Sequence, residues 1–243
     1  MRILIISDIH GNLPALESVL AEAGAWDATW CLGDLVGYGP NPNECVARVQ
    51  ELPGLIGVVG NHDRAALEDS SLVGFNADAR AALFWTRDTL TPESRSYLDS
   101  LPTVVEAGDF TLVHGAPRQP VWEYILDVSG ARANFSRFAT PFCVVGHTHV
   151  PVVFRETNPG GTCLQEPPDY VNSRSLNGDR LILNPGSVGQ PRDGIAFAAY
   201  AILDAETGLW DHCRVPYDVS ETQQRMEAFA LPERLILRLS FGM

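Results

Sequence analysis

Histidine side chains in this sequence stand where short apolar runs end. Five of the six histidines lie at such points, in short segments that contain glycine, aspartate or asparagine, and only His212 lacks this setting. Histidine is the commonest metal ligand in proteins and the side chain that exchanges protons most readily near neutral pH. The arrangement predicts that these five side chains contribute to one metal-binding or proton-transfer site. They are His10, His62, His114, His147 and His149.

Two carboxylates and one carboxamide occupy the same kind of position. Asp34 follows Asp8 by 26 residues, and Asn61 follows Asp34 by 27. Each interval is close to the length of one strand–helix–strand unit. Open α/β sheets bind their ligands at the carboxyl ends of parallel strands. We therefore expect Asp8, Asp34 and Asn61 to meet the histidines at one sheet edge.

The chemistry of these groups favours borderline divalent ions. Carboxylate, carboxamide and imidazole ligands without a thiolate suit Mn, Fe, Co, Ni or Zn better than Ca. The five cysteines form no Cys-x-x-Cys pair, which argues against thiolate ligands and suits a reducing compartment. Even without one of the five histidines, the seven remaining groups exceed what one ordinary site uses. They suit two ions about 3.5–4 Å apart that share a bridging carboxylate, as in many hydrolases of phosphate esters.

Apolar runs and helical periodicity predict the elements that position these residues. In the first third of the chain, continuous apolar runs alternate with helical patterns, which is typical of a largely parallel sheet covered on both faces. Strands are predicted at 2–7, 28–32, 55–59, 103–106, 110–113, 142–145, 151–154, 181–183, 195–203 and 209–215. Helices are predicted at 13–23, 43–52, within 76–101, after an N-cap at Ser220 and after Pro232, and 158–178 is predicted as a loop or exposed hairpin.

These elements predict one α/β domain over residues 1–243. Two sheets of mixed parallel and antiparallel strands would form a sandwich flanked by helices, an αββα arrangement. The net charge of −13 argues against a protein that binds nucleic acid through a broad basic surface. No apolar run approaches the length of a membrane span, and no targeting segment precedes the first strand. The sequence therefore predicts a cytoplasmic protein without a membrane partner.

Five ordered segments resemble the motifs of the calcineurin-like metallophosphoesterase superfamily. The resemblance covers residues 8–149, and the segment from Asn184 to Gly194 extends it to the small prokaryotic phosphodiesterase-like branch. A single Asp-x-His pair would be weak, whereas five motifs in order are specific. The segments are Asp8-x-His10, Gly33-Asp34, Gly60-Asn61-His62-Asp63, His114 and Gly146-His147-x-His149.

The resemblance implies a role for each of these residues. Asp8, His10 and His149 would hold the first metal ion. Asp34 would bridge the two ions, and Asn61, His114 and His147 would hold the second. His62 would face the phosphate as a general acid or as a stabiliser of the leaving oxygen, with Asp63 orienting its ring; a role for His62 as an extra ligand or as a polar residue behind the ligands stays open.

The function implied is hydrolysis of phosphodiesters or small phosphomonoesters by hydroxide that two divalent ions activate. The predicted partner is thus a small phosphate ester, with nucleic acid only as a substrate. A nuclease is one alternative, but the acidic charge and the lack of an added basic domain weigh against it. A non-catalytic binding scaffold on the same fold is the other, and the intact motifs weigh against it. The sequence carries no signal for an oligomeric state.

One position departs from better-known branches of the superfamily. Tyr38 stands where serine/threonine phosphatases and symmetrical dinucleoside tetraphosphatases carry an arginine. A tyrosine cannot give phosphate two parallel N–H bonds, so these two substrate classes are not expected to be preferred.

Loops are expected to select the substrate, because functional residues concentrate there. The segments concerned are 64–76, 115–130 and 155–180. Arg118 and Arg192 are loop arginines that are candidates for holding phosphate, with a solvated surface role as the alternative. Trp122 and Tyr124 are predicted to pack in the core or a lid rather than to stack on a base.

Overall fold

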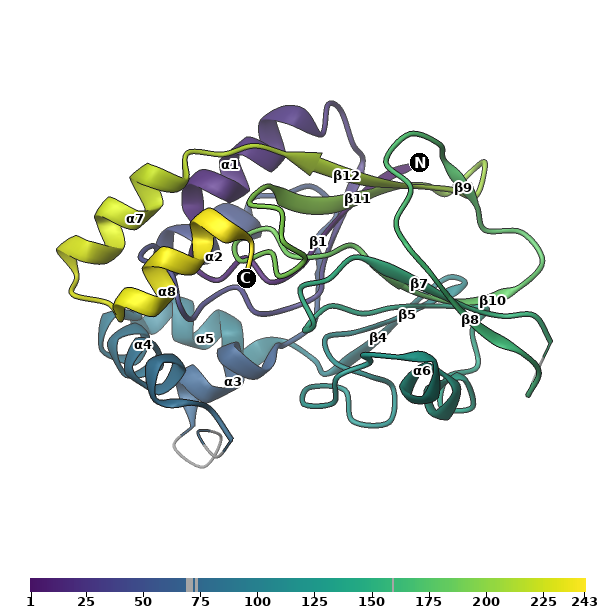
Figure 1. The fold of residues 1–243 in the computed structure, drawn as a ribbon, viewed down its shortest axis with the longest axis horizontal. Coiled ribbons are helices and arrows are strands. Elements are labelled where there is room, and N and C mark those ends of the chain that lie inside the picture. The colour runs from purple at the N-terminus through teal and green to yellow at the C-terminus, as the bar shows by residue number, and fades with distance from the viewer. Residues whose placement is uncertain (69–71, 73, 159) are drawn as a thin grey trace.

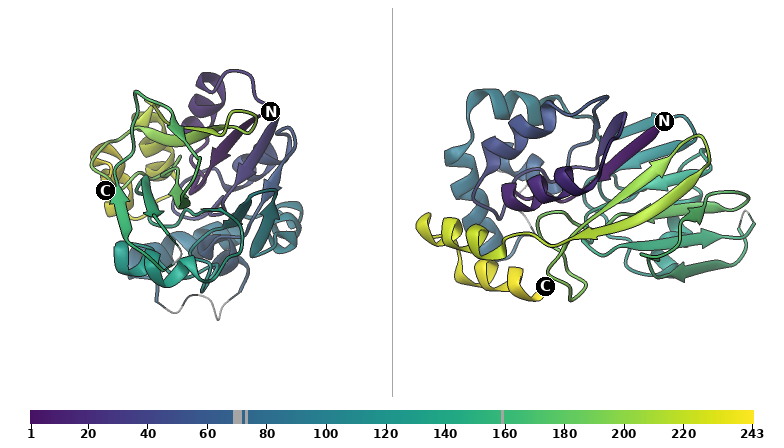
Figure 2. Two further views of the ribbon diagram at one scale, coloured as in Figure 1. Left: turned by 90° about the vertical axis from the view of Figure 1, so that its right-hand side faces the viewer. Right: turned by 90° about the horizontal axis from the view of Figure 1, so that it is seen from above.

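The chain folds into two stacked sheets with helices on both outer faces. The computed structural model describes residues 1–68, 72, 74–158 and 160–243. Most helices gather at one end of the strands, where the chain leaves β1 and its parallel neighbours (Figure 1). The two further views in Figure 2 show the strands extending together away from this helical end. The predicted αββα sandwich of mixed strands is confirmed.

The first sheet has the strand order β3-β2-β1-β11-β12-β9. Its strands β1, β2 and β3 are parallel, and the remaining strands join them in antiparallel fashion. The predicted parallel unit at the start of the chain is therefore present. The strands are β1 (Arg2–Ile6), β2 (Ala28–Cys31), β3 (Ile56–Gly57), β9 (Arg174–Ser175), β11 (Ala198–Asp204) and β12 (Leu209–Val215).

The second sheet has the order β4-β5-β6-β10-β7-β8. Here β5, β6 and β10 are parallel, while β4, β7 and β8 pair in antiparallel fashion. The strands are β4 (Val104–Ala107), β5 (Phe110–Val113), β6 (Phe142–Val144), β7 (Val152–Glu156), β8 (Cys163–Glu166) and β10 (Arg180–Asn184).

Apolar residues on both faces of β1 explain why the sheets stack. Ile3 and Ile5 are buried between the sheets, together with Leu112 and Leu183 from the second sheet. Leu4 and Ile6 point the other way and are buried against helices. Because successive strand residues face opposite sides, a continuous apolar run is what a strand covered on both faces requires.

Helices cover the outer faces and the end of the sandwich. Helices α1 (Leu13–Glu22) and α2 (Pro42–Gln50) pack with the first sheet, and α6 (Val128–Phe135) packs with the second. Proline in the first turn suits α1 and α2, because the amide it lacks has no partner there. The other helices are α3 (Asn61–Leu67), α4 (Ala77–Thr89), α5 (Pro92–Ser100), α7 (Val219–Ala228), α8 (Glu233–Leu237) and the 3-10 turn η2 (Arg238–Phe241).

Several local predictions need correction. Part of the expected loop 64–76 belongs to α3, and residues 69–71 and 73 of that loop lie outside the described residues. The expected loop 115–130 ends in α6, whose N-cap is Asp127. The segment 158–178 contains β8 and β9, so the hairpin alternative holds for its first part. Asp218 caps α7 in place of Ser220, because its carboxylate accepts the amide hydrogen of Glu221.

Candidate metal centre

The predicted ligands converge at the carboxyl ends of both sheets. Asp8 follows β1, Asp34 follows β2 and Asn61 opens α3 directly after β3. His114 follows β5, and the 146–149 turn follows β6 in the parallel part of the second sheet. Residues far apart in the sequence thus meet at one edge, as the strand-end positions predict.

Two groups of side chains there have the spacing of metal ligands. In each group, one possible ligand atom per residue lies within 4.8 Å of all the others. Asp34 belongs to both groups, and Asn61 joins the second through its Oδ1, which lies 3.0 Å from His114 Nε2. The first group is Asp8, His10, Asp34 and His149, and the second is Asp34, His114 and His147.

Backbone carbonyls orient all four histidine rings of these groups. His10, His114 and His149 each direct Nδ1 at a carbonyl oxygen, those of Val36, Leu32 and Gln190. His147 instead directs Nε2 at the Trp122 carbonyl, 3.3 Å away. Because a carbonyl can only accept, the nitrogen facing it carries the hydrogen, and the other nitrogen keeps a lone pair.

The lone-pair nitrogens face one another in two pairs. His10 Nε2 lies 3.1 Å from His149 Nε2, and His114 Nε2 lies 3.1 Å from His147 Nδ1. Two lone pairs at that distance repel unless a proton or a cation lies between or beside them. Neutral imidazole nitrogens held in this way fit divalent metal ions.

Asp34 provides an independent test of the same fit. Its Oδ1 accepts the His62 amide hydrogen at 2.8 Å, whereas its Oδ2 is buried without any hydrogen-bond partner. That orphaned oxygen lies 3.6 Å from His10 Nε2 and 3.4 Å from His114 Nε2, between the two groups. A buried carboxylate oxygen without a partner is costly, and a shared pair of cations would satisfy it.

Burial and charge shift the pKa values of these groups in different directions. Burial lowers the pKa of His10 and of His147 to about 3, so both rings are neutral near pH 7. Burial also acts to lower the pKa of His114, but the nearby Asp34 carboxylate outweighs it and raises that pKa to about 9. Burial raises the pKa of Asp8 to about 7. The centre therefore combines neutral His10 and His147 rings with a His114 ring that is protonated near pH 7 beside the strongly acidic Asp34, and a metal ion bound there would take the place of that proton.

The backbone of this edge is unusual. The predicted ligands Asp8, His10, Asp34, His147 and His149 all have positive φ, as does Tyr38. Non-glycine residues adopt this conformation at a cost of about 1–2 kcal/mol each. Hydrogen bonds hold the turns in place: the Asp8 amide donates to Gly33 O, and the His10 amide donates to Asp34 O.

His62 lies in the first turn of α3, beside the first group. Its ring centroid is 4.3 Å from that of Tyr38 and 4.8 Å from those of His10 and Phe75. Its Nδ1 is buried without a hydrogen-bond partner, and burial lowers the pKa of the ring. His62 is thus near the predicted ligands without sharing their carbonyl-oriented geometry.

Asp63 was predicted to orient the His62 ring, but its carboxylate binds backbone amides instead. Its carboxylate accepts the amide hydrogens of Gly60 at 3.0 Å and Val36 at 3.1 Å. These bonds complete the cap of α3 and tie it to the turn after β2. The expected direct orientation of the ring is therefore corrected: Asp63 positions the helix that carries His62.

The two candidate arginines differ in their surroundings. Arg118 pairs with Glu123, with Nη2 2.5 Å from Oε1, and this ion pair engages its guanidinium within the loop after β5. Arg192 lies beside the ligands: its amide donates to His149 O, and its Nη2 is 3.0 Å from Gln190 Oε1 and 3.5 Å from the Tyr38 hydroxyl. The Nε of Arg192 is buried without a partner. Of the two, only Arg192 is brought to the centre.

Asn184 holds the ligand turn after β6, a role that the sequence patterns did not assign to it. Its Nδ2 donates to Gly146 O at 2.8 Å and lies 3.0 Å from Thr148 Oγ1. Its position as the first residue of the 184–194 segment was the available signal. The bonds fix the turn that carries His147 and His149.

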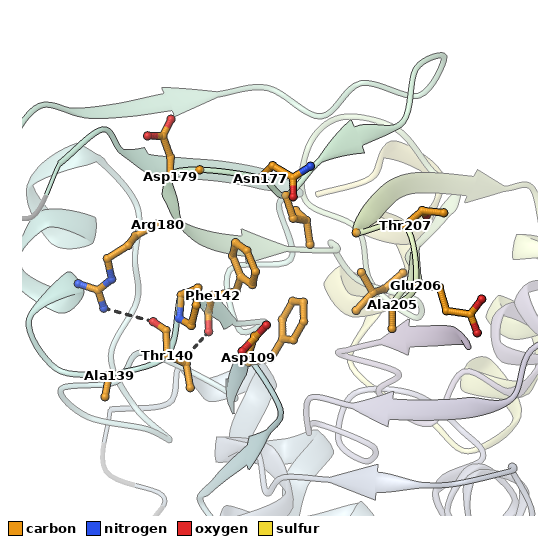
Figure 3. A pocket seen from close by; sticks show the side chains of 16 residues that line it. Asp109, Ala139, Thr140, Phe142, Asn177, Asp179, Arg180, Ala205, Glu206 and Thr207 are labelled. Carbon is orange, nitrogen blue, oxygen red and sulfur yellow. Dashed lines mark hydrogen bonds between the residues drawn. The ribbon is translucent and has the colours of Figure 1, made fainter.

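A separate cavity lies at the opposite end of the sandwich (Figure 3). Its volume is about 620 Å³, and it opens where β5, β6 and β10 begin and β11 turns into β12. Asp109, Thr140, Arg180 and Thr207 are among its lining residues. None of the predicted site residues lines it, so this cavity is distinct from the candidate metal centre.

A family model for the calcineurin-like phosphoesterase superfamily domain matches residues 1–208. The chain belongs to this superfamily. This phosphoesterase is similar to a metallophosphoesterase from Sphaerobacter thermophilus, with 47% identity and a TM-score of 0.92 over 100% of this chain and 99% of that one. It is 38% identical to an uncharacterized protein of Methanocaldococcus jannaschii, over 99% of this chain and 98% of the relative.

A more distant relative is Phosphodiesterase YfcE of Escherichia coli K12. The identity is 26% over 215 residues, which cover 84% of this chain and 88% of that enzyme. In the described part of this phosphoesterase, no helix combines the length and the apolar character needed to cross a membrane.

Proposed function

We propose that this phosphoesterase hydrolyses phosphodiesters or small phosphomonoesters at a centre of two divalent ions. The observation that carries the proposal is Asp34, which belongs to both ligand groups and keeps a buried oxygen without a partner between them. The donor set of carboxylate, carboxamide and imidazole suits Mn, Fe, Zn, Ni or Co. The distant relationship to an enzyme named as a phosphodiesterase supports the diester alternative.

Each ion would have its own residues. Asp8, His10 and His149 would hold the first, Asn61, His114 and His147 the second, and Asp34 both. Two bound cations supply Lewis acidity, which polarises a phosphoryl group and acidifies water near neutral pH. The carbonyl-oriented rings keep the donor nitrogens in place before the ions bind, so little rearrangement is needed.

His62 would act on the leaving oxygen. Its Nδ1 faces Gly37, where even a Cβ would come within 2.5 Å, so no ligand can reach that side. Nε2 is therefore the atom that would donate a hydrogen bond to the departing oxygen, which favours the stabilising role over the general-acid role. The low pKa of the buried ring favours the neutral form, which donates from one nitrogen only.

Arg192 would hold a phosphate oxygen. Its guanidinium carbon lies 5.9 Å from the centre of the Tyr38 ring. The guanidinium of Arg192 thus lies next to Tyr38, the position at which other branches of the superfamily have an arginine. Its unpartnered Nε and its neighbours Gln190 and Tyr38 leave donor hydrogens free for an anion. Arg118, by contrast, is proposed to stabilise its own loop through Glu123.

Metal reconstitution tests the proposal. Chelated protein is loaded separately with Mn, Fe, Co, Ni or Zn and assayed with bis(4-nitrophenyl) phosphate, 4-nitrophenyl phosphate and a cyclic nucleotide. We expect no turnover without metal and full turnover at two ions per chain. Hydrolysis of none of these esters with any ion at two per chain contradicts the proposed activity. Saturation at one ion per chain contradicts the two-ion centre.

A further inference from the structure

Three aromatic side chains border the candidate metal centre, and we call them the aromatic wall: Phe75, Trp122 and Tyr124. Trp122 is 40% exposed and Tyr124 is 46% exposed. Both belong to the loop between β5 and α6, whereas Phe75 precedes α4. These exposures exclude the core alternative predicted for Trp122 and Tyr124, and the lid alternative stays a prediction.

The wall runs from a predicted second-ion ligand to His62. The Tyr124 ring stacks on the His147 ring, with centroids 3.7 Å apart and planes at 18°. The Trp122 carbonyl accepts from the same histidine. Phe75 connects the two ends, because its centroid lies 6.4 Å from that of Trp122 and 4.8 Å from that of His62.

Buried residues and hydrogen bonds fix the loop that carries Trp122 and Tyr124. Val121 and Ile125 flank the segment from Trp122 to Tyr124 and are buried, so the exposed rings cannot turn inward without removing these two residues from the core. Glu123 pairs with Arg118 and accepts from Asn134 Nδ2, and the Asn134 Oδ1 accepts the Arg118 amide hydrogen. The rings are therefore presented in advance to whatever binds beside the ions, which lowers the entropy cost of binding.

We propose that the aromatic wall binds a planar ring carried by the ester group that leaves the phosphate. The inference rests on the proposed function, since His62 marks the leaving side of the phosphate and Phe75 contacts His62. Stacking on an exposed aromatic face tolerates any planar π system. A nucleobase and a simple aryl group share this chemistry, and the preferred substrate is an ester of one of them rather than of an alkyl alcohol.

Binding of non-hydrolysable phosphonates to the metal-loaded protein tests the wall without turnover. Calorimetry compares phenylphosphonate with methylphosphonate, and the phosphonate analogue of adenosine monophosphate with that of ribose phosphate. We expect the ring-bearing member of a pair to bind about tenfold more tightly, within the range measured for base stacking on protein aromatics. A preference in the nucleoside pair alone identifies a nucleobase, and one in both pairs identifies any aryl ring.

Variants test whether the aromatic wall causes the preference for ring-bearing phosphonates. Trp122→Leu should remove most of it, Trp122→Phe should keep most of it, and the backbone carbonyl that holds His147 remains in both. Phe84→Leu is the matched control, because Phe84 is 50% exposed on α4 outside the wall, and the preference should survive there. Metal content per chain is measured for each variant.

The outcomes separate this inference from the proposed function. Equal affinities within both pairs overturn the wall, even if the esters are hydrolysed. A ring preference that survives in Trp122→Leu with full metal content also overturns it. Conversely, a ring preference without hydrolysis of any ester refutes the proposed activity and leaves the wall as a binding surface. If Trp122→Leu loses metal, the wild-type pairs still decide.

Discussion

The two ends of the same sandwich are built in different ways. At the carboxyl ends of β1, β2 and β6, aspartate and histidine adopt positive φ in addition to glycines such as Gly11 and Gly33, namely at Asp8, His10, Asp34, His147 and His149. At the opposite end, around the cavity of Figure 3, the turns with positive φ are made by glycine, including Gly108, Gly178 and Gly208. Glycine adopts this conformation without the steric cost that a Cβ imposes.

The difference shows where the fold carries strain. Among the described residues, seven non-glycine residues have positive φ, and Ala230 is the one that lies away from the candidate centre. Strained conformations persist only where surrounding contacts hold them, and they cluster at functional sites. At the end with the candidate metal centre, aspartate and histidine stand at strained positions, as expected if their side chains serve as metal ligands. At the other end the backbone is relaxed, and the chemistry of the side chain is dispensable.

Removing the shared carboxylate is the largest test of this contrast. Asp34→Asn keeps the size of the side chain but removes the charge that both ions would share. We expect both ions to be lost at micromolar metal and turnover to fall more than about 10⁴-fold, beyond what a single proton-transfer group contributes. Metal analysis of the purified variant and its rate on bis(4-nitrophenyl) phosphate measure this. Full activity would refute the bridging assignment.

A smaller loss should follow at His62, which lies at the same end and has ordinary backbone geometry. His62→Ala should keep two ions per chain and lower kcat by about 10²–10³-fold, the usual cost of removing one hydrogen-bond donor to a developing negative charge. His62→Gln is the control, because an amide can donate a hydrogen bond and restore part of the rate. Loss of metal in His62→Ala would show instead that this side chain is a ligand.

The contrast also explains how far the sequence could lead. The meeting of Asp8, Asp34 and Asn61 at one sheet edge followed from apolar runs and spacing, because each of them lies at the end of a predicted parallel strand. Helix α6 was missed, because Asp127 and Gly130 look like turn residues until the helix packs on the second sheet. Tertiary packing, not local preference, decides such short segments.

Side-chain contacts between residues far apart in the sequence were harder to predict than the helices and strands. Asp63 was expected to meet its neighbour His62, but its carboxylate caps α3 and reaches Val36 after β2. Arg192 contacts Tyr38, although the two residues are 154 positions apart in the sequence. The motif around Tyr38 has no arginine, and the segment 184–194 places a guanidinium beside it. Spacing identifies which residues share an edge. It does not say which side chain occupies each place along it.

The stability of the fold should depend on pH through His212, which lies between the two sheets. Its Nε2 lies 3.0 Å from the Asn184 carbonyl of β10, and burial lowers its pKa to about 4 from an ordinary 6.5. Between these values the unfolded chain binds a proton that the folded one does not, so this contribution is constant above pH 6.5 and stability is lost as the pH falls toward 4. The loss is about 3 kcal/mol at most.

Urea unfolding from pH 4 to 8 compares wild type with His212→Gln, which cannot titrate. We expect the difference between their free energies of unfolding to change across this range and to be flat above pH 6.5. The histidines of the centre titrate in both proteins and cancel in the comparison, since distant sites contribute additively. A parallel pair of curves would show that His212 does not stay neutral in the fold.

The smallest effects should come from the relaxed end and from Ala230. Gly108 has φ of +59° in the β4–β5 turn, with open space where a Cβ would stand. Gly108→Ala should therefore cost about 1 kcal/mol from backbone conformation alone, and Gly108→Asn less, because asparagine tolerates this region.

Ala230 lies directly after the C-cap of α7 and has φ of +53°, so Ala230→Gly should stabilise the fold by about 1 kcal/mol. Thermal unfolding measures all three, and turnover should stay at the wild-type level. A loss of activity in Gly108→Ala would break the contrast, because it would couple the relaxed end to the metal centre.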